Sequence, residues 1–402
     1  MNNPKLRFRD DSGSRFVDWQ KVSFGKTFSF LKSSAFSRAQ LNYRGGQIKN
    51  VHYGDILVKF PTILNSCCND VPYVNPAEKT EKYDLLQVGD IVIADTAEDL
   101  TVGKAIEISD VSNNIIAGLH TIACRPQRKF ANRFLGYYLN SKAFHNQLVP
   151  LATGIKVYSI IKSEIVKTRI NVPCLEEQQK IANFFSTLDE KIELSERKLE
   201  ALQQLKKGLM QKIFSNSIWG KVALKTVCQS FSGGTPSSKN KDFYVGDIPF
   251  IRSAEIHGNT TALFINQSAL DKSSAKMVNK GDLLYALYGA NSGDCDISKI
   301  NGAINQAILC IRPLYENTVD VLFLKEQLYH RKGQIISTYL QGGQGNLSGS
   351  LVMNLSVMLP PYKEQVKISA LFSLLNDKID LNKQKISLLQ QLKQGFMQQM
   401  FV

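Results

Sequence analysis

The sequence predicts an α+β protein: two mixed α/β domains joined by two long helices that form an antiparallel coiled coil, with pseudo-twofold symmetry from an internal duplication. Three observations predict this fold class. The chain repeats itself, each repeat ends in a long run with helical periodicity, and short strand-like and helix-like segments precede each run. The 402 residues exceed one ordinary core, and 43% apolar residues supply material for two.

The duplication is clearest toward the end of each repeat. Residues 177–214 align without a gap on residues 364–401, at an offset of 187, and 20 of these 38 positions are identical. Each half therefore combines a divergent domain with a near-constant segment. The predicted boundaries are 1–174 for the first domain, 175–214 for the first helix, 215–361 for the second domain and 362–402 for the second helix.

Both near-constant segments show the alternating three-four apolar spacing of a coiled-coil seam. The predicted seam positions are Phe185, Leu188, Ile192, Ser195, Leu199 and Leu202 in the first segment, and Phe372, Leu375, Ile379, Asn382, Ile386 and Leu389 in the second. The matched polar positions Ser195 and Asn382, followed by Lys206 and Lys393, are expected to fix the register at a cost in stability. A surface helix with a wider apolar face is the alternative. Two matched seams in one chain favour a helix pair, and about 40 residues at ~1.5 Å each predict a spacer of about 60 Å.

The divergent domains contain apolar runs that follow Gly-Asp pairs, a pattern that predicts a turn and then a strand. Strands are expected at 56–58, 91–94 and 283–286, and helices near 130–147 and 319–340. Mixed strands and helices of this kind predict α/β domains, each with a twisted sheet.

The chain is basic, with a formal net charge of +14. Residues 176–214 contain seven acidic and seven basic side chains, and residues 363–402 contain three acidic and six basic ones. These helical segments together carry +3, so +11 falls on the domains. A basic domain surface favours a polyanionic partner such as nucleic acid, although a generally basic protein also fits the charge alone.

Loops rich in glycine, polar and basic residues are the candidate nucleic-acid contacts. Glycine lets the backbone approach phosphates, lysine and arginine neutralise them, and Asn, Gln and Arg can pair with base edges. Each loop also fits an ordinary solvated loop, but their recurrence in both domains favours DNA contact. The candidates are Arg38, Asn42, Tyr43 and Arg44 in the first domain, and Gly233, Gly234, Thr235, Ser237, Lys239, Lys241, Arg252, Tyr288, Asn291, Gln344 and Asn346 in the second.

Several enzyme classes are disfavoured by missing motifs. The chain has no GxxxxGK[ST] phosphate loop, and its nearest match to an adenine-methyltransferase motif, at 359–362, has leucine in place of the required asparagine. The five histidines lack metal-ligand spacing, and the seven cysteines form no CxxC pair. We therefore expect no catalytic residues and no metal. Without an apolar leader or a ~20-residue apolar run, we expect a cytoplasmic protein that does not contact a membrane.

The motifs, in their order along the chain, resemble the specificity subunits of Type I restriction–modification systems. The loop at 233–237 (Gly-Gly-Thr-Pro-Ser) and the run at 281–289 are similar to that family's target-recognition domain, and the runs at 48–56 and 118–121 are similar to another variant of it. The proline and Glu-Gln pair before each helix, at 173–178 and 360–365, are similar to the family's entry into its spacer helices. The first domain lacks the Gly-Gly-Thr-Pro loop.

This resemblance implies a non-catalytic, sequence-specific subunit that reads a split, asymmetric site in double-stranded DNA, with one domain per half-site. It also implies docking of two modification (methyltransferase) subunits and of restriction/translocase subunits. Those partners would use S-adenosylmethionine, ATP and Mg²⁺, and this chain would bind no cofactor. The alternative is a recognition subunit associated with a DNA methyltransferase but with no restriction partner. A coiled-coil protein without sequence preference is disfavoured, because a spacer has no reason to vary its ends.

Overall fold

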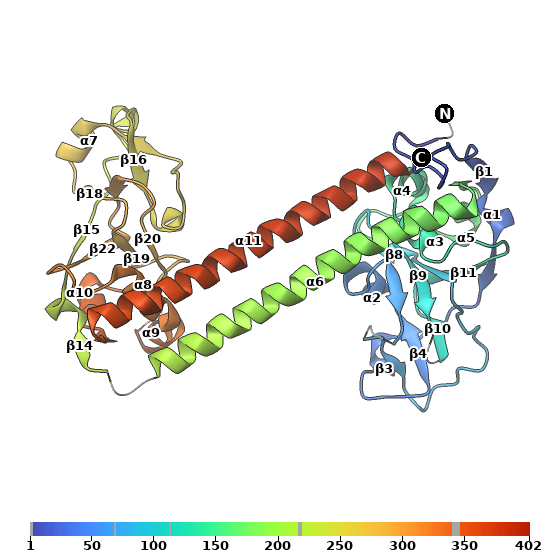
Figure 1. The fold of residues 1–402 in the computed structure, drawn as a ribbon, viewed down its shortest axis with the longest axis horizontal. Coiled ribbons are helices and arrows are strands. Elements are labelled where there is room, and N and C mark those ends of the chain that lie inside the picture. Colours follow the sequence, from blue (N-terminus) through green and yellow to red (C-terminus); the bar gives the residue numbers. More distant parts are fainter. Residues whose placement is uncertain (1–2, 68–69, 112–113, 216–218, 340–345) are drawn as a thin grey trace. The chain divides into compact units, whose positions relative to one another are not determined.

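The computed structural model describes residues 3–67, 70–111, 114–215, 219–339 and 346–402, and the chain divides into two compact units (Figure 1). Unit 1 comprises Met1–Glu196 with Gln384–Val402, and unit 2 comprises Arg197–Lys383. Each unit holds one α/β domain, called domain 1 or domain 2, together with part of each long helix. The long helices are α6 (Leu175–Phe214) and α11 (Tyr362–Met400).

Domain 1 is built on a five-stranded and a four-stranded sheet. The five-stranded sheet has the order β2 (Phe28–Leu31), β11 (Thr121–Pro126), β7 (Ile91–Ala94), β9 (Ala105–Asp110), β5 (Ile63–Asn65). The four-stranded sheet has the order β10 (Asn114–Ala117), β4 (Ile48–Val51), β6 (Tyr73–Val74), β3 (Leu41–Asn42). Two strand pairs complete it: β1 (Gln20–Ser23) with β13 (Arg169–Val172), and β8 (Thr96–Ala97) with β12 (Tyr158–Ser159).

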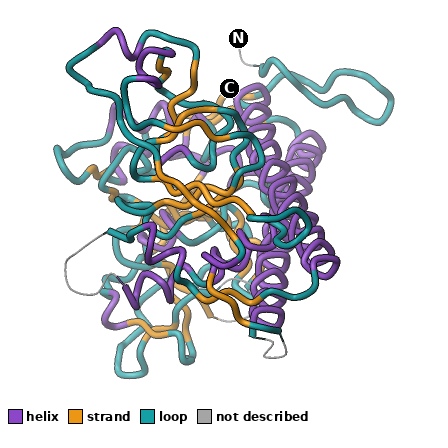
Figure 2. Tube along the Cα trace, turned by 90° about the vertical axis from the view of Figure 1, so that its left-hand side faces the viewer, coloured by secondary structure: helices purple, strands orange, loops and turns teal. Residues whose placement is uncertain are grey.

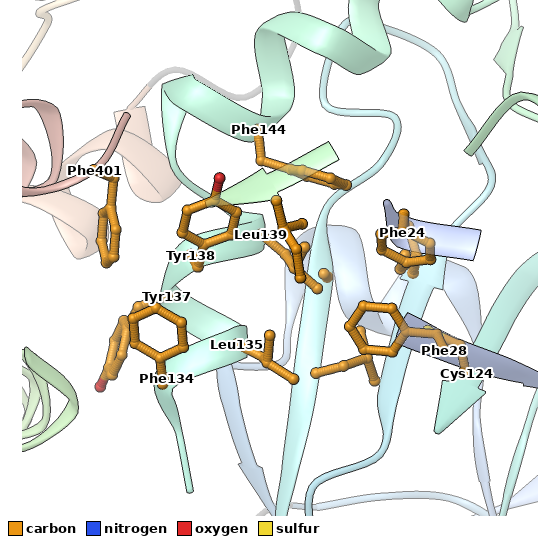
Figure 3. Packing of buried hydrophobic residues seen from close by; sticks show 14 of the residues in the cluster. Phe24, Phe28, Cys124, Phe134, Leu135, Tyr137, Tyr138, Leu139, Phe144 and Phe401 are labelled. Atoms are coloured by element: carbon orange, nitrogen blue, oxygen red, sulfur yellow. The ribbon is translucent and has the colours of Figure 1, made fainter. Parts of the chain in front are cut away.

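Five short helices pack around these sheets and close the core of unit 1. They are α1 (Phe24–Thr27), α2 (Tyr53–Val58), α3 (Phe134–Leu139), α4 (Lys142–Leu148) and α5 (Lys162–Ile165). The largest buried cluster is aromatic, and Figure 3 shows rings of α1, β2, α3 and α4 lying together with Phe401 near the chain's end. This cluster joins domain 1 to its share of the long helices, because Ile181 and Phe185 of α6 belong to the same core.

Domain 2 has two four-stranded sheets. One has the order β15 (Cys228–Ser232), β22 (Ile308–Pro313), β19 (Leu283–Ala286), β20 (Cys295–Ile297), and the other β17 (Phe264–Ile265), β16 (Ile248–Ile251), β21 (Gly302–Ile304), β18 (Lys276–Val278). β14 (Lys221–Ala223) pairs with β23 (Ser356–Met358). The helices are α7 (Gln267–Asp271), α8 (Val321–His330), α9 (Lys332–Tyr339) and α10 (Gly349–Met353).

The two domains repeat one sheet topology. The order β2-β11-β7-β9 in domain 1 matches β15-β22-β19-β20 in domain 2, and the parallel pair β4–β10 matches the parallel pair β16–β21. The Gly-Asp and Arg-Pro motifs meet in both copies: Arg125 donates to Asp90 at 2.8 and 2.7 Å, and Arg312 to Asp282 at 2.8 and 2.6 Å. In each copy the ion pair therefore holds the turn before one strand, β7 or β19, against the end of the strand paired with it, β11 or β22.

The Gly-Asp rule is wrong at one of the three predicted strands. Strands do begin at Ile91 and Leu283, but residues 56–58 lie in helix α2. A strand would bury residues 56 and 58 on one face; instead Ile56 is buried, Val58 is 89% exposed and Phe60 is buried, which is helical spacing. His52 caps this helix by accepting from the Gly54 backbone N–H at 3.2 Å.

The long helices lie side by side and antiparallel within each unit (Figure 1, Figure 2). In unit 1, Phe184 contacts Phe396 with ring centroids 5.0 Å apart, and further along α6, Asp189 pairs with Lys393. In unit 2, Lys206 lies near Asn376, and Phe214 stacks on Phe372 at 6.1 Å. In both units, residues further along α6 contact residues that come earlier in α11, so the two helices run in opposite directions.

Every predicted seam position on the two helices is buried or half-buried. Phe185, Ser195, Phe372, Leu375, Ile379, Asn382 and Ile386 are buried, and Leu188, Ile192, Leu199, Leu202 and Leu389 are half-buried. The polar Ser195 keeps its hydroxyl satisfied by donating to the Lys191 carbonyl at 2.8 Å, which lowers the cost of burying it. No helix within the described residues combines the length and the apolar character that a membrane span needs.

Candidate nucleic-acid interface

The glycine-rich loop of domain 2, at 232–241, is anchored at its start and exposed beyond it. A side chain at Gly233 would place its Cβ 1.8 Å from the Ile304 carbonyl oxygen, and one at Gly234 would place it 2.5 Å from Ser274. Both glycines are buried, so close packing against strand β21 and its neighbour requires them, and phosphate approach is not the reason for them. The Thr235 hydroxyl donates to Gln306 at 2.6 Å.

Beyond this anchor the loop presents its basic side chains to solvent. Ser237, Lys239 and Lys241 are exposed. Tyr244 donates from its hydroxyl to the Pro236 carbonyl at 2.7 Å and fixes the base of the loop. In this candidate loop the glycines position the backbone, while the lysines are the groups available to phosphates.

The other candidates of domain 2 come together from separate loops. Arg252, 44% exposed at its side chain, donates to Glu255 at 3.0 Å, and the next residue, Ser253, accepts from Asn291 at 3.3 Å. Tyr288 forms an isolated antiparallel bridge with Asn346, which brings those two candidates together. Gln344 lies outside the described residues.

In domain 1 the four candidates fall into two local arrangements. Arg38 donates twice to the buried Asp55, at 2.7 and 2.9 Å, and its guanidinium keeps a side exposed. Tyr43 is 50% exposed and carries the Lys59 ammonium 4.4 Å from its ring centroid. Asn42 uses its carbonyl oxygen to accept from the backbone of Arg44 and Gly45, so Asn42 shapes the turn that exposes Arg44.

Three further residues, Tyr53, His52 and His120, lie together near the domain 1 candidates, and residue type alone does not single them out. Tyr53 lies two residues before the Asp55 that holds Arg38, and its ring meets His120 edge-on at 5.2 Å. His52 lies beside Tyr53, with ring centroids 4.7 Å apart, and burial, followed by the nearby Arg38 charge, lowers the pKa of this imidazole. The similarity of 48–56 and 118–121 to a recognition-domain variant was the available signal.

The exposed lysine, arginine and asparagine side chains of these loops are groups of the kind that bind nucleic acid. Among the residues that the structure describes, no three His, Cys, Asp or Glu side chains are grouped so as to hold a metal ion. The Glu107 carboxylate, which is buried, accepts from the backbone N–H groups of Arg133 and Gly136 at 2.6 and 2.8 Å. Burial raises the pKa of Glu107 to about 7, and the group lies at the start of α3 beside a pocket that Asp90 and Arg125 also line.

Comparison with known proteins identifies the family. The model of the Type I restriction modification DNA specificity domain matches this chain twice, over residues 18–204 and 216–391. Together these matches cover most of the chain, and the two copies agree with the duplicated fold. The chain belongs to the family of Type I restriction–modification DNA specificity subunits.

Individual relatives are distant but extensive. The putative type I restriction enzyme MjaX specificity subunit of Methanocaldococcus jannaschii is 24% identical over 343 residues, which cover 80% of this chain and 79% of the relative. The EcoKI specificity subunit of Escherichia coli is 22% identical, covering 61% of this chain and 58% of that one. The crystal structure of the S subunit from M. genitalium has a TM-score of 0.64 at 17% identity, covering 100% and 99% of the two chains, and shares the fold.

Proposed function

We propose that this chain reads a split, asymmetric DNA site, with domain 1 (residues 1–174) on one half-site and domain 2 (residues 215–361) on the other. The observation that carries the proposal is one sheet topology, with the same Asp–Arg lock, beneath loops of unrelated sequence. A common scaffold with different exposed loops supports two readers of different sequence, because base readout depends on the side chains that reach the groove. The helices, residues 175–214 and 362–402, would set the separation of the half-sites.

Replacing residues 215–361 by the second domain of another family member tests this proposal. We expect the complex with modification subunits to methylate a site in which one half is new and the other half is unchanged. Methylome sequencing of cells that carry the chimaera reads both halves directly. A change in both halves, from a chimaera that assembles normally, would refute one domain per half-site.

The proposed contacts of domain 2 are the exposed Lys239 and Lys241, with Arg252 and Asn291 nearer to the bases. Lysine contacts to phosphate release counterions, so each lost contact lowers the slope of log affinity against log salt by about 0.9. Lys239→Ala with Lys241→Ala should therefore weaken binding to all duplexes and lower the slope by about 2. The matched control is Lys221→Ala with Lys225→Ala. Both lysines are exposed and precede strand β15, whereas the loop follows it. An unchanged slope in the loop variant would remove this loop from the interface.

We further propose that the outer side of α11 docks the modification subunits, with restriction subunits added to that core. In unit 2, Leu374 and Leu381 are 52% and 64% exposed, seven residues apart and off the seam; in unit 1, Leu388 is 57% exposed at the next such step. Exposed leucines at heptad spacing favour a partner helix. Leu374→Gln with Leu381→Gln should abolish co-purification of the modification subunit while helicity is kept, whereas Ser387→Gln, on another side of α11, should not.

In this proposal the chain is not itself an enzyme and binds no cofactor. The methyltransferase partners would use S-adenosylmethionine, and the restriction/translocase partners ATP and Mg²⁺, in the cytoplasm where the DNA is. A recognition subunit that serves a methyltransferase alone is the second candidate. Assembly with modification subunits that yields methylation, but no ATP-dependent cleavage with any host restriction subunit, would favour that second candidate.

A further inference from the structure

Each unit contains a lysine on one long helix that reaches across to the other helix and to the domain. In unit 1 this is Lys393 of α11, which forms an ion pair with Asp189 of α6. Tyr137 of α3, which is 1% exposed, donates from its hydroxyl to the same Asp189 carboxylate at 2.8 Å. The domain residue in this lock is therefore a neutral hydrogen-bond donor, and the acid belongs to the helix.

In unit 2 the lysine is Lys206 of α6. It donates to the Asn376 side-chain oxygen of α11 at 2.7 Å and lies 3.3 Å from the carboxylate of Glu326 on α8. Asn376 in turn donates to Glu326 at 3.1 Å, and Glu326, which is 3% exposed, also pairs with the adjacent Lys325 of α8 at 2.9 Å. Here the acid belongs to the domain, and the helix supplies a neutral amide.

These two locks occupy equivalent places in the duplicated fold. Lys206 and Lys393 are 187 residues apart, as are Asp189 and Asn376, which is the offset of the helix repeat. Helices α3 and α8 align at an offset of 189, with the buried Phe134 and Phe323 as one matched pair, which equates Tyr137 with Glu326. The lysine is kept in both copies, while the acid has moved from the helix to the domain.

A mixed combination would leave either lock incorrectly charged. Tyr137 beside Asn376 would give the helix lysine no carboxylate. Glu326 beside Asp189 would place two adjacent carboxylates at the helix lysine, and Lys325, already paired with Glu326, would be the only other cation of the lock. A half-buried lysine without an acid loses its compensating charge, and two adjacent carboxylates repel each other. Only the native combinations, Tyr137 with Asp189 and Glu326 with Asn376, provide one acid for each lysine from these two positions.

We propose that these paired positions form a compatibility code that ties each recognition domain to the helix that follows it. A domain can then be exchanged without loss of stability together with its own helix, as 1–214 or 215–402, or alone onto a helix whose residue at the coded position matches it. Both copies have a lysine at this position, so each module can supply the lysine that completes the other module's lock. This inference concerns assembly of the chain and does not depend on which DNA is read.

A double-mutant cycle in unit 1 of the full chain tests the code. Asp189→Asn should lower the unfolding temperature of unit 1 by roughly 3–6 °C, because Lys393 loses its acid. Tyr137→Glu should lower it by at least as much, because ring packing is lost and a second carboxylate faces Asp189. Combining both changes recreates the acid on the domain and the amide on the helix that unit 2 has, with Gly136 in place of Lys325, and the loss should fall short of the sum of the single losses by about 3 °C or more.

The controls for this cycle are Glu190→Gln and Asp377→Asn, exposed carboxylates next to the coded positions on the same helices. They should shift the unfolding temperature by less than about 1 °C. Hydrogen exchange at α3 and at residues 183–192 assigns each loss to this junction. Strictly additive losses in the double variant would overturn the code, because a structural role for each residue alone predicts additivity.

A chain in which the two domains exchange places while both helices stay provides a second test. Its locks are mismatched, so we expect poor solubility or an unfolding temperature reduced by more than 5 °C. Adding Asp189→Asn and Asn376→Asp corrects both locks and should recover part of that loss, whereas adding Glu190→Gln and Asp377→Asn should recover none. Equal behaviour of the corrected and control chains would overturn the proposal, and the point-variant cycle remains decisive if no exchanged chain folds.

Discussion

The two units attach their domain to their helices with different chemistry. In unit 1 the junction is aromatic: Phe401 packs against Phe185, Phe134 and Tyr138, with ring centroids 5.6, 6.2 and 5.6 Å apart. In unit 2 Phe214, which matches Phe401, packs against Phe323 and Phe372 with ring centroids 5.6 and 6.1 Å apart. Beside these rings lies an open pocket of about 720 Å³ between α6, α11 and α8, lined by Lys206, Lys325, Glu326 and other charged side chains. One duplicated scaffold thus accommodates an aromatic junction that is fully packed in one unit and borders a charged pocket in the other.

The largest expected effect comes from removing the central ring of each junction. Phe401→Ala deletes a ring that is 4% exposed and touches four other rings, so it should cost unit 1 about 3–5 kcal/mol. Phe214 in unit 2 touches Phe323, Phe372 and His330, and His330 lines the pocket, so Phe214→Ala should cost only about 2–3 kcal/mol. Denaturant unfolding followed by hydrogen exchange measures the loss in each unit, and equal losses would contradict the contrast between the junctions.

A smaller difference is expected at the repeated Asp–Arg lock inside the domains. The Asp90 side chain is 1% exposed and that of Asp282 is 12% exposed, while both accept from an arginine and a backbone N–H. Asp90→Asn should cost about 2–3 kcal/mol and Asp282→Asn about 1–2 kcal/mol, because water can solvate the second site in part. Thermal unfolding of the two variants, with Asp377→Asn as the surface control, tests the order; a larger loss for Asp282→Asn would reverse it.

The smallest effect is the pH dependence that His257 contributes in unit 2. His257 lies between Asp296, at 2.9 Å, and Asp294, at 3.2 Å, and hydrogen bonding to Asp296 and then Asp294 raises the pKa of this imidazole above its ordinary 6.5. The stabilisation is therefore complete below about pH 6.5 and is lost as the pH rises through the raised folded value. His257 is half exposed, so the effect should stay below about 1 kcal/mol. Between pH 6 and 8.5, the plot of unit 2 stability against pH should be flatter in His257→Gln. An unchanged slope would assign the pH dependence to other groups.

Regular features of the fold could be predicted from sequence wherever the pattern is long or repeated. The helices α6 and α11 follow from seams of about 40 residues, and the strands at 91–94 and 283–286 from a repeated Gly-Asp motif. The short run at 56–58 was predicted wrongly because three residues cannot distinguish a period of 2 from a period of 3.6. The next buried residue, Phe60, supplies the distinction only when burial is known.

The candidate interface also combines features visible in the sequence with features visible only in the structure. Composition marks the loop at 232–241 as a candidate, yet only packing against Ile304 shows that Gly233 holds the loop in place. Residue type alone also did not single out Tyr53 and His120, because they are 67 positions apart and meet through the ends of β4 and β10. Contacts between distant loops depend on strand pairing, which a single sequence does not encode locally.

The sequence by itself determined the duplication, the seam positions and the basic character of the domains, because these are periodic or additive properties of the chain. Only the tertiary structure decided which acid neutralises each conserved lysine. Asp189 and Asn376 stand at matched positions, and nothing local shows that Tyr137 and Glu326 complete their locks. A buried charge is compensated by whatever folding brings within a few ångströms of it. Here Lys393 and Asp189 are 204 residues apart along the chain, and Lys206 and Glu326 are 120 residues apart.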